Sequence, residues 1–335
     1  MRLAYAHADP GQERPSRRRQ RQGVLYVSSY PLGSGITPAN AANPPGGADF
    51  KACTIPHKKI SIIEVSAPKG KFSFRLREQA LADDTTPYRG GLGGTPFIAC
   101  HDIQAFLRKD IALGSCAGES QIWDISNRWM PGIEHARNHT HIRRPADATT
   151  REYEFMHSAF FGWDGKVVAT MDETGGGVEA RCFGSRPGSQ DGYYYFYNVV
   201  RPGSPEPPLR SRYVIPRQQG EGQECVSHNA NTIPVKNRYL ASIAYYQGGV
   251  SVVDFTNVDN PREVAFADLS DATGTADEWS SFWYIFSNSG LGREGPNANR
   301  GLDVYKPVGD LARKTRGAKR WAYSNPQTQE AWQAP

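Results

Sequence analysis

Residues 121–126 read Gln-Ile-Trp-Asp-Ile-Ser, a short β-branched and aromatic segment that carries an acid near its end and is followed by Pro131. The pattern returns twice along the chain. The two other copies are Val-Ser-Val-Val-Asp-Phe at residues 250–255, before Pro261, and Gly-Leu-Asp-Val-Tyr at residues 301–305, before Pro307. Recurrence of one segment along a chain indicates a repeat architecture.

Each copy follows an opening segment at a similar distance. The openings are Cys100-His101-Asp102-Ile103, Val226-Ser227-His228-Asn229 and Trp279-Ser280-Ser281-Phe282. The separations from opening residue to acid are 23 for His101 to Asp124, 26 for His228 to Asp254 and 24 for Trp279 to Asp303. A fourth unit runs from Met156-His157 to Tyr197 with a longer loop, and an incomplete fifth covers Val24–Tyr30 and Ile60–Val65.

Every unit reads as three short strands, the third ending in an acid, and a proline-bounded edge segment. Four-stranded units of about 40–50 residues are typical of propeller blades. The predicted fold is therefore all-β, a β-propeller over residues 23–310 with about five recognisable blades and six or seven expected in a full ring. A β-sandwich is the alternative, although it does not require the same openings and closings to recur. Only residues 309–319 are weakly compatible with a helix.

Charge is concentrated at one end of the chain. The formal net charge is +5, and residues 1–22 contribute six Arg against Asp9 and Glu13, which is +4 and leaves +1 elsewhere. We interpret residues 1–22 as a basic disordered tail or a mis-called start, and residues 311–335 as a C-terminal tail. No nucleic-acid-binding motif occurs outside the Arg segment, no apolar run has the length of a transmembrane helix, and no signal peptide can be read at the start.

The closings, together with Cys-His-Asp-Ile at residues 100–103 and Met-Asp-Glu at residues 171–173, resemble the LVIVD repeat of bacterial and archaeal β-propeller proteins over roughly residues 24–307. This resemblance implies an exported or surface-associated protein. It also implies a binding or scaffolding role for a monomer, with a protein, glycan or small molecule bound at the mouth of the channel.

Three histidines occupy equivalent opening positions, and blade symmetry should bring them together around the axis. These are His101, His157 and His228. Three imidazoles suit one Zn, Cu or Fe ion, with Asp102, Asp172 or Glu173 as a further oxygen ligand or as the partner that orients a ring. The alternative function is therefore a metal-dependent enzyme, an oxidoreductase or a hydrolase. The competing interpretation is that each ring ties adjacent blades by hydrogen bonds, and the fourth equivalent residue, Trp279, cannot ligate a metal.

The run Met171-Asp172-Glu173-Thr174-Gly175-Gly176-Gly177 ends a predicted strand with two carboxylates and a glycine loop. It could bind Ca²⁺ or form an acid-capped turn. Glu173 is the candidate general base because it should lie near the histidines. The acids Asp124, Asp254 and Asp303 are expected to be structural, accepting hydrogen bonds from the N–H groups of the next turn.

Five cysteines stand at residues 53, 100, 116, 182 and 225, without a zinc-finger spacing. If the protein is exported, the expected disulfides are Cys100–Cys116 and Cys182–Cys225, with Cys53 left over. In a cytosolic protein all five would be buried thiols.

Overall fold

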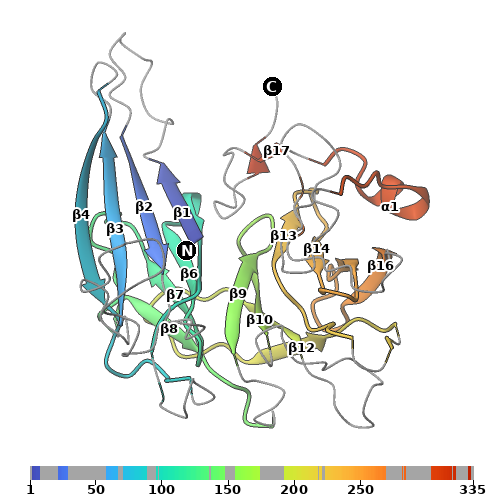
Figure 1. Ribbon diagram of the computed structural model, residues 1–335, viewed down its shortest axis with the longest axis horizontal. Helices are drawn as coiled ribbons and strands as arrows, with labels where there is room; N and C mark the ends of the chain where they lie inside the picture. Colours follow the sequence, from blue (N-terminus) through green and yellow to red (C-terminus); the bar gives the residue numbers. More distant parts are fainter. Residues whose placement is uncertain are drawn as a thin grey trace, which may run out of the picture.

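The computed structural model describes most of the predicted blades. The described residues are 2–7, 22–28, 58–66, 71–88, 96, 98–135, 137–147, 155–173, 192–217, 219–220, 223–268, 281, 283, 303–318, 320–321 and 331–332. Strands predominate among them, and they gather into separate upright sheets that follow one another across the molecule (Figure 1). The prediction of an all-β fold is confirmed.

Four four-stranded antiparallel sheets form the described body, and in each one the strands follow chain order. The first contains β1 (Arg2–His7), β2 (Gln22–Ser28), β3 (Lys59–Ser66) and β4 (Ser73–Ala80). The second contains β5 (Asp102–Phe106), β6 (Ile111–Ser115), β7 (Ser120–Asp124) and β8 (His139–Ile142). The third contains β9 (Met156–Phe161), β10 (Val167–Asp172), β11 (Tyr194–Asn198) and β12 (Leu209–Tyr213). The fourth contains β13 (Ala230–Ile233), β14 (Leu240–Ala244), β15 (Val250–Asp254) and β16 (Arg262–Ala267).

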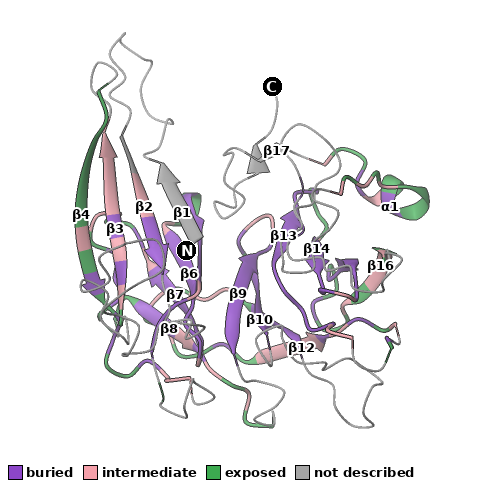
Figure 2. Cartoon of the chain, viewed as in Figure 1, coloured by how far each residue is buried: buried purple, intermediate pink, exposed green. Residues whose placement is uncertain are grey.

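The first strands of successive sheets lie beside one another, because β1 contacts β5, β5 contacts β9 and β9 contacts β13. Between neighbouring sheets the facing side chains form one apolar layer after another. Ile60 packs with Trp123 between the first two sheets, Ile122 with Tyr195 between the next two, and Phe196 with Phe255 between the last two. Figure 2 shows β9 and β13 buried and parts of β4 and β16 exposed. The sheets are thus propeller-like blades, and a closed ring of six or seven stays a prediction.

The third predicted copy of the repeat differs from the others. Trp279 lies outside the described residues, whereas Asp303 is described and is not part of a strand. Beyond it, a short helix α1 (Gly309–Lys314) forms in the segment that the sequence marks as helix-compatible. Its Leu311 packs with Trp283 against the fourth sheet. A 3₁₀ turn η4 (Leu107–Lys109) and a two-stranded sheet of β17 (Arg320–Trp321) and β18 (Ala331–Trp332) complete the elements.

Part of the N-terminal segment that the sequence analysis interprets as a tail or mis-called start is described, and residues 8–21 lie outside the described residues. Residues 2–7 form β1, which pairs with β2 from Arg2↔Ser28 to His7↔Gly23. The physical reason is that an extended neighbour offers a row of backbone donors and acceptors, and pairing with it satisfies them whatever the side-chain charge. The first sheet thereby gains the innermost strand that the sequence did not reveal. Near the C-terminus α1, β17 and β18 are also described.

One of the two predicted disulfides is confirmed. Cys100 and Cys116 form a disulfide across the start of β5 and the end of β6. Cys225 is also disulfide-bonded. Cys53 and Cys182 lie outside the described residues, so the Cys182–Cys225 connectivity stays a prediction. In the described part of the chain no helix has the length and apolar character needed to cross a bilayer.

Candidate functional site

His157 is the second residue of β9 and is re-aimed by an irregularity in the strand pairing. Met171 pairs with Ser158 and Asp172 pairs with Met156, so the register of β9 against β10 skips His157. An extra residue of this kind forms a β-bulge, which turns a side chain away from its regular direction and often occurs beside functional sites. The side chain of His157 is 3% exposed.

Glu173 directly follows β10 and is held by the backbone just before β9, the neighbouring strand of the same sheet. Its N–H donates to the carbonyl of Phe155 at 2.9 Å. The carboxylate is 5% exposed, and burial of a charged group is unfavourable unless it is paired and hydrogen-bonded. Here Glu173 is paired on both sides, because it lies between two histidines.

His228 precedes β13 and supplies the second imidazole. Its N–H donates to the carbonyl of Ala244 at 2.8 Å, which fixes the backbone against β14. Nδ1 of the ring lies 2.9 Å from the side-chain amide nitrogen of Asn229. That contact orients the ring so that Nε2 faces Glu173, and an amide flip lets Asn229 support either tautomer.

The donor atoms of these three side chains converge. Nε2 of His157 lies 3.3 Å from Oε2 of Glu173, and Nε2 of His228 lies 3.3 Å from Oε1. One ligand atom from each of the three residues lies within 4.8 Å of the others. Two atoms each about 2.1 Å from a tetrahedral ion lie about 3.4 Å apart, so the observed spacing fits a metal ion. Chemically, the set is two imidazoles and one carboxylate.

His101 joins this cluster by ring contact rather than as one of the three converging donors. It lies immediately before β5, and its ring centroid is 3.5 Å from that of His157. The centroids of His157 and His228 are 4.4 Å apart. The structure therefore brings the three predicted histidines together, but Glu173 takes the place that the sequence analysis gave to His101 in the donor set.

Tyr246 is a further member that the sequence analysis did not single out. Its hydroxyl donates to Oε1 of Glu173, and its ring centroid is 4.8 Å from that of His228. The residue lies in the turn between β14 and β15 with φ at 46°, a left-handed conformation that is rare for a bulky side chain. Such strain persists where surrounding structure holds the residue in place. In the sequence, the feature that could have pointed to Tyr246 is an aromatic residue shortly before the Gly248-Gly249 turn.

The two aspartates predicted as further ligands take other positions. Oδ1 of Asp172 accepts the N–H of Phe155 at 2.7 Å, and its carbonyl accepts the hydroxyl of Ser227 at 3.3 Å. Asp172 therefore ties β9, β10 and the segment before β13 together. Asp102 is buried at the start of β5, where it pairs with Ser115. Neither is in the converging donor group, and residues 174–177 of the candidate calcium loop lie outside the described residues.

The repeat-closing acids make the turn contacts expected of them at two positions. Oδ1 of Asp124 accepts the N–H of Ser126 at 2.8 Å, and Oδ1 of Asp254 accepts the N–H of Thr256 at 3.1 Å. Such bonds to the residue two positions on stabilise the turn that ends the strand.

A second converging donor group was missed by the sequence analysis. It consists of Asp84, His139 and His141, at the outer edge of the second sheet. The signal that could have found it is the His-x-His spacing of residues 139–141, because alternate residues of a strand point to the same face.

No protein-family model and no curated protein matches this chain. Among solved structures it is similar to hydrazine synthase from Kuenenia stuttgartiensis, with 10% sequence identity and a TM-score of 0.32 over 64% of each chain. The match thus spans less than two thirds of that protein's chain. A similarity this low carries no argument about function, which depends here on the side-chain geometry.

Proposed function

We propose that this protein is a metal-dependent enzyme of the propeller type, in which His157, Glu173 and His228 hold one transition-metal ion. The observation that carries the proposal is that the two Nε2 atoms each lie 3.3 Å from a different oxygen of Glu173. Sets of two histidines and one carboxylate leave coordination positions open. They serve non-haem Fe(II) oxygenases and also zinc hydrolases.

The substrate that fits this site is a small molecule. All three side chains are at least 95% buried, so a polymer cannot reach the ion without rearrangement of the blades. We favour an oxidoreductase over a hydrolase, because a closed site suits reactions from which bulk water must be excluded. Within this proposal Tyr246 holds the Glu173 carboxylate in place, and His101 contributes a third imidazole beside the ring of His157.

Metal analysis of the purified full chain tests this function. We expect one Fe, Zn, Cu or Mn ion per chain to be lost in His157→Ala and in Glu173→Gln, compared with a His135→Asn control at an exposed histidine. Iron would favour the oxidoreductase, whereas zinc is compatible with either reaction class. Equal metal content in the control and in both variants, after incubation with each metal, would exclude the proposal.

An extracytoplasmic location accompanies the proposed function. The supporting observation is the Cys100–Cys116 disulfide, since disulfides persist in oxidising compartments and are rare in the cytosol. It also supports the second candidate function, the extracytoplasmic binding or scaffolding role that the LVIVD resemblance implies.

Five cysteines with two disulfides leave one thiol. Titration of the denatured, unreduced protein should therefore find about one reactive thiol, whereas five would contradict the location.

A further inference from the structure

His139 and His141 lie on β8, the outermost strand of the second sheet, and therefore project to the same face. Their register partners on β7 are Trp123 and Gln121, which cover the base of that face. The side chain of His139 is fully buried and that of His141 is 12% exposed. Two imidazoles on a well-paired strand are thus held with little freedom.

Asp84 reaches the same place from the connection between the first and second sheets. The two residues after it are fastened to β7 and its preceding turn: the hydroxyl of Thr85 accepts a hydrogen bond from Gln121 at 3.0 Å, and that of Thr86 donates to Glu119 at 2.5 Å. Asp84 itself is 55% exposed. It therefore lies at the solvent side of the two histidines, on a segment whose position is fixed by buried partners.

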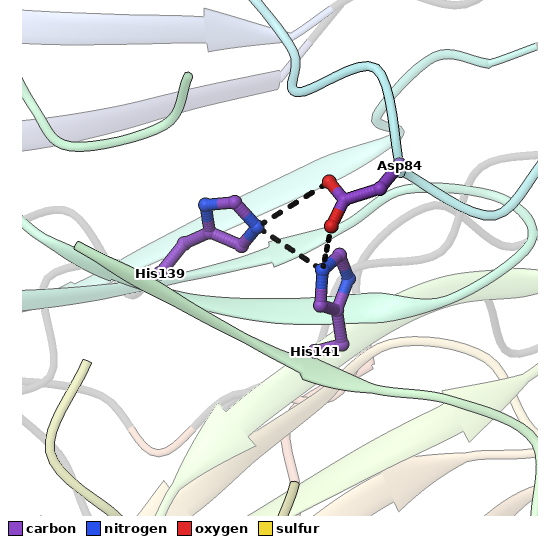
Figure 3. Close-up of side chains that lie close together, drawn as sticks. All are labelled: Asp84, His139 and His141. Atoms are coloured by element: carbon purple, nitrogen blue, oxygen red, sulfur yellow. Dashed lines mark hydrogen bonds and ion pairs between the residues drawn. The ribbon is translucent and has the colours of Figure 1, made fainter. Parts of the chain in front are cut away.

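The three side chains point toward one another (Figure 3). The two Nε2 atoms are 3.1 Å apart. Oδ2 of Asp84 lies 3.1 Å from Nε2 of His141, and Oδ1 lies 3.8 Å from Nε2 of His139. These spacings bracket the separation of about 3.4 Å expected between ligands of a tetrahedral zinc ion.

Glu119 supplies the outer support that histidine ligands generally require. Oε1 of this fully buried carboxylate lies 2.6 Å from Nδ1 of His141, and Gln121 donates to the same oxygen at 2.6 Å. Gln121 in turn accepts the indole N–H of Trp123 at 2.7 Å. A carboxylate on Nδ1 leaves Nε2 as the ligating atom and makes the ring a better donor.

We propose that Asp84, His139 and His141 bind a divalent transition-metal ion of the zinc class at the outer edge of the second sheet. The ion fastens the connection after β4 to β8. Its remaining coordination position faces solvent, on the side of the exposed Asp84 carboxylate. This site is independent of the cluster around Glu173.

Zinc binding to the full chain, stripped of metal and then dialysed against Zn²⁺, tests the site. Asp84→Asn is compared with Asp83→Asn, its exposed neighbour, and His141→Asn with His135→Asn. We expect Asp84→Asn and His141→Asn each to hold one zinc fewer per chain than their controls. Glu119→Gln should retain the ion but bind it about 10–100-fold more weakly.

The measured quantity is the difference in zinc ions per chain between each variant and its control. It tests this site whether or not the cluster around Glu173 also binds metal. Asp84→Asn changes an exposed side chain and should leave the circular dichroism spectrum unchanged. The site is overturned if Asp84→Asn binds as many zinc ions as Asp83→Asn, with the same affinity.

Discussion

The imidazole rings of His157 and His228 lie 4.4 Å apart although they belong to different sheets, and the Glu173 carboxylate contacts both. Burying a carboxylate between two imidazoles carries a desolvation penalty, which is unfavourable for the stability of a core. Strongly polar buried clusters of this kind often mark functional sites. Because His157 lies on β9 of the third sheet and His228 precedes β13 of the fourth, an ion held between them would fasten the third sheet to the fourth.

Removal of metal should therefore destabilise the whole chain. A ligand that binds only the folded state stabilises it by about 2.7 kcal/mol when its concentration is 100 times Kd. We expect a chelator to lower the melting temperature of the wild type, and to lower that of Glu173→Gln by less. Differential scanning fluorimetry with and without chelator measures both shifts.

The matched control for that experiment is Glu206→Gln, which changes an exposed glutamate that is not in the donor set. It should respond to the chelator like the wild type. A chelator-induced shift in Glu173→Gln as large as that in the control would count against a metal bound by Glu173.

Replacement of Tyr246 by Phe isolates the contribution of one hydroxyl. The side chain donates to Oε1 of Glu173, so its loss frees the carboxylate to rotate while the ring still packs against His228. Loss of a group that orients a metal ligand typically weakens binding 10–100-fold, and we expect a loss of about that size. Titration of the metal-free protein measures it. Unchanged affinity would mean that Tyr246 has only a packing role.

The sequence predicted the cluster through recurrence, not through any local motif. Equivalent openings place His101, His157 and His228 at or just before neighbouring first strands, and in the structure the ring of His157 lies against those of His101 and His228. The sequence could not rank Glu173 above His101 as a converging donor, because that choice depends on the bulge at His157. The position of a one-residue shift in strand register cannot be predicted from the amino-acid composition of the strands.

The site at Asp84 was missed for a different reason. Its histidines lie on β8, the fourth strand of its sheet, where the repeat has no constant residue, and Asp84 comes from the connection between two units. Repeat symmetry predicts only residues that stand at equivalent positions in several blades. It therefore gives no indication of a site that occurs in one blade. The pairing of β1 was likewise hidden, since its six residues carry no strand signal strong enough to outweigh the neighbouring Arg run.

Gly114 provides a test of the packing between β6 and β7. A Cβ atom at this position would overlap the ring of Trp123 on the neighbouring strand, and that ring is buried and hydrogen-bonded to Gln121. Overpacking in a core typically costs about 1–3 kcal/mol, so Gly114→Ala should lower the free energy of unfolding by about that amount. Urea unfolding monitored by fluorescence measures the change. Gly220→Ala, whose Cβ would meet only the flexible end of Gln223, is the control and should be close to neutral.

The Cys100–Cys116 disulfide should contribute substantially to stability. It closes a segment with a sequence separation of 16 residues, and a loop of about 15 residues corresponds to roughly 3 kcal/mol. The double variant Cys100→Ser/Cys116→Ser should lose about this much in the free energy of unfolding. Reductant should destabilise the wild type further than it destabilises the double variant. Equal losses in the two proteins would show that this disulfide contributes little.

Asp254 should make the stability of the chain dependent on pH in the acid range. Its Oδ2 accepts a hydrogen bond from Nζ of Lys314 on α1 at 2.6 Å, and Oδ1 accepts the N–H of Thr256. Burial opposes ionisation, but these bonds, led by that of Lys314, lower the pKa of the carboxyl group. A pKa that is lower in the folded than in the unfolded state contributes stability above the unfolded value of about 3.9, and this contribution is lost as the pH falls through the folded pKa.

Asp254→Asn should therefore lower the free energy of unfolding at pH 7 by about 1.5–3 kcal/mol, the size typical of hydrogen bonds to a charged group. The difference between wild type and variant should shrink at pH values below about 4, where the wild-type carboxylate also becomes protonated. Urea unfolding at pH 7, 5, 4 and 3 measures it. Asp259→Asn, which breaks an exposed pair with Arg210, should change stability far less. A difference for Asp254→Asn that stays constant from pH 7 to pH 3 would show that packing, and not the ionised carboxylate, accounts for the loss.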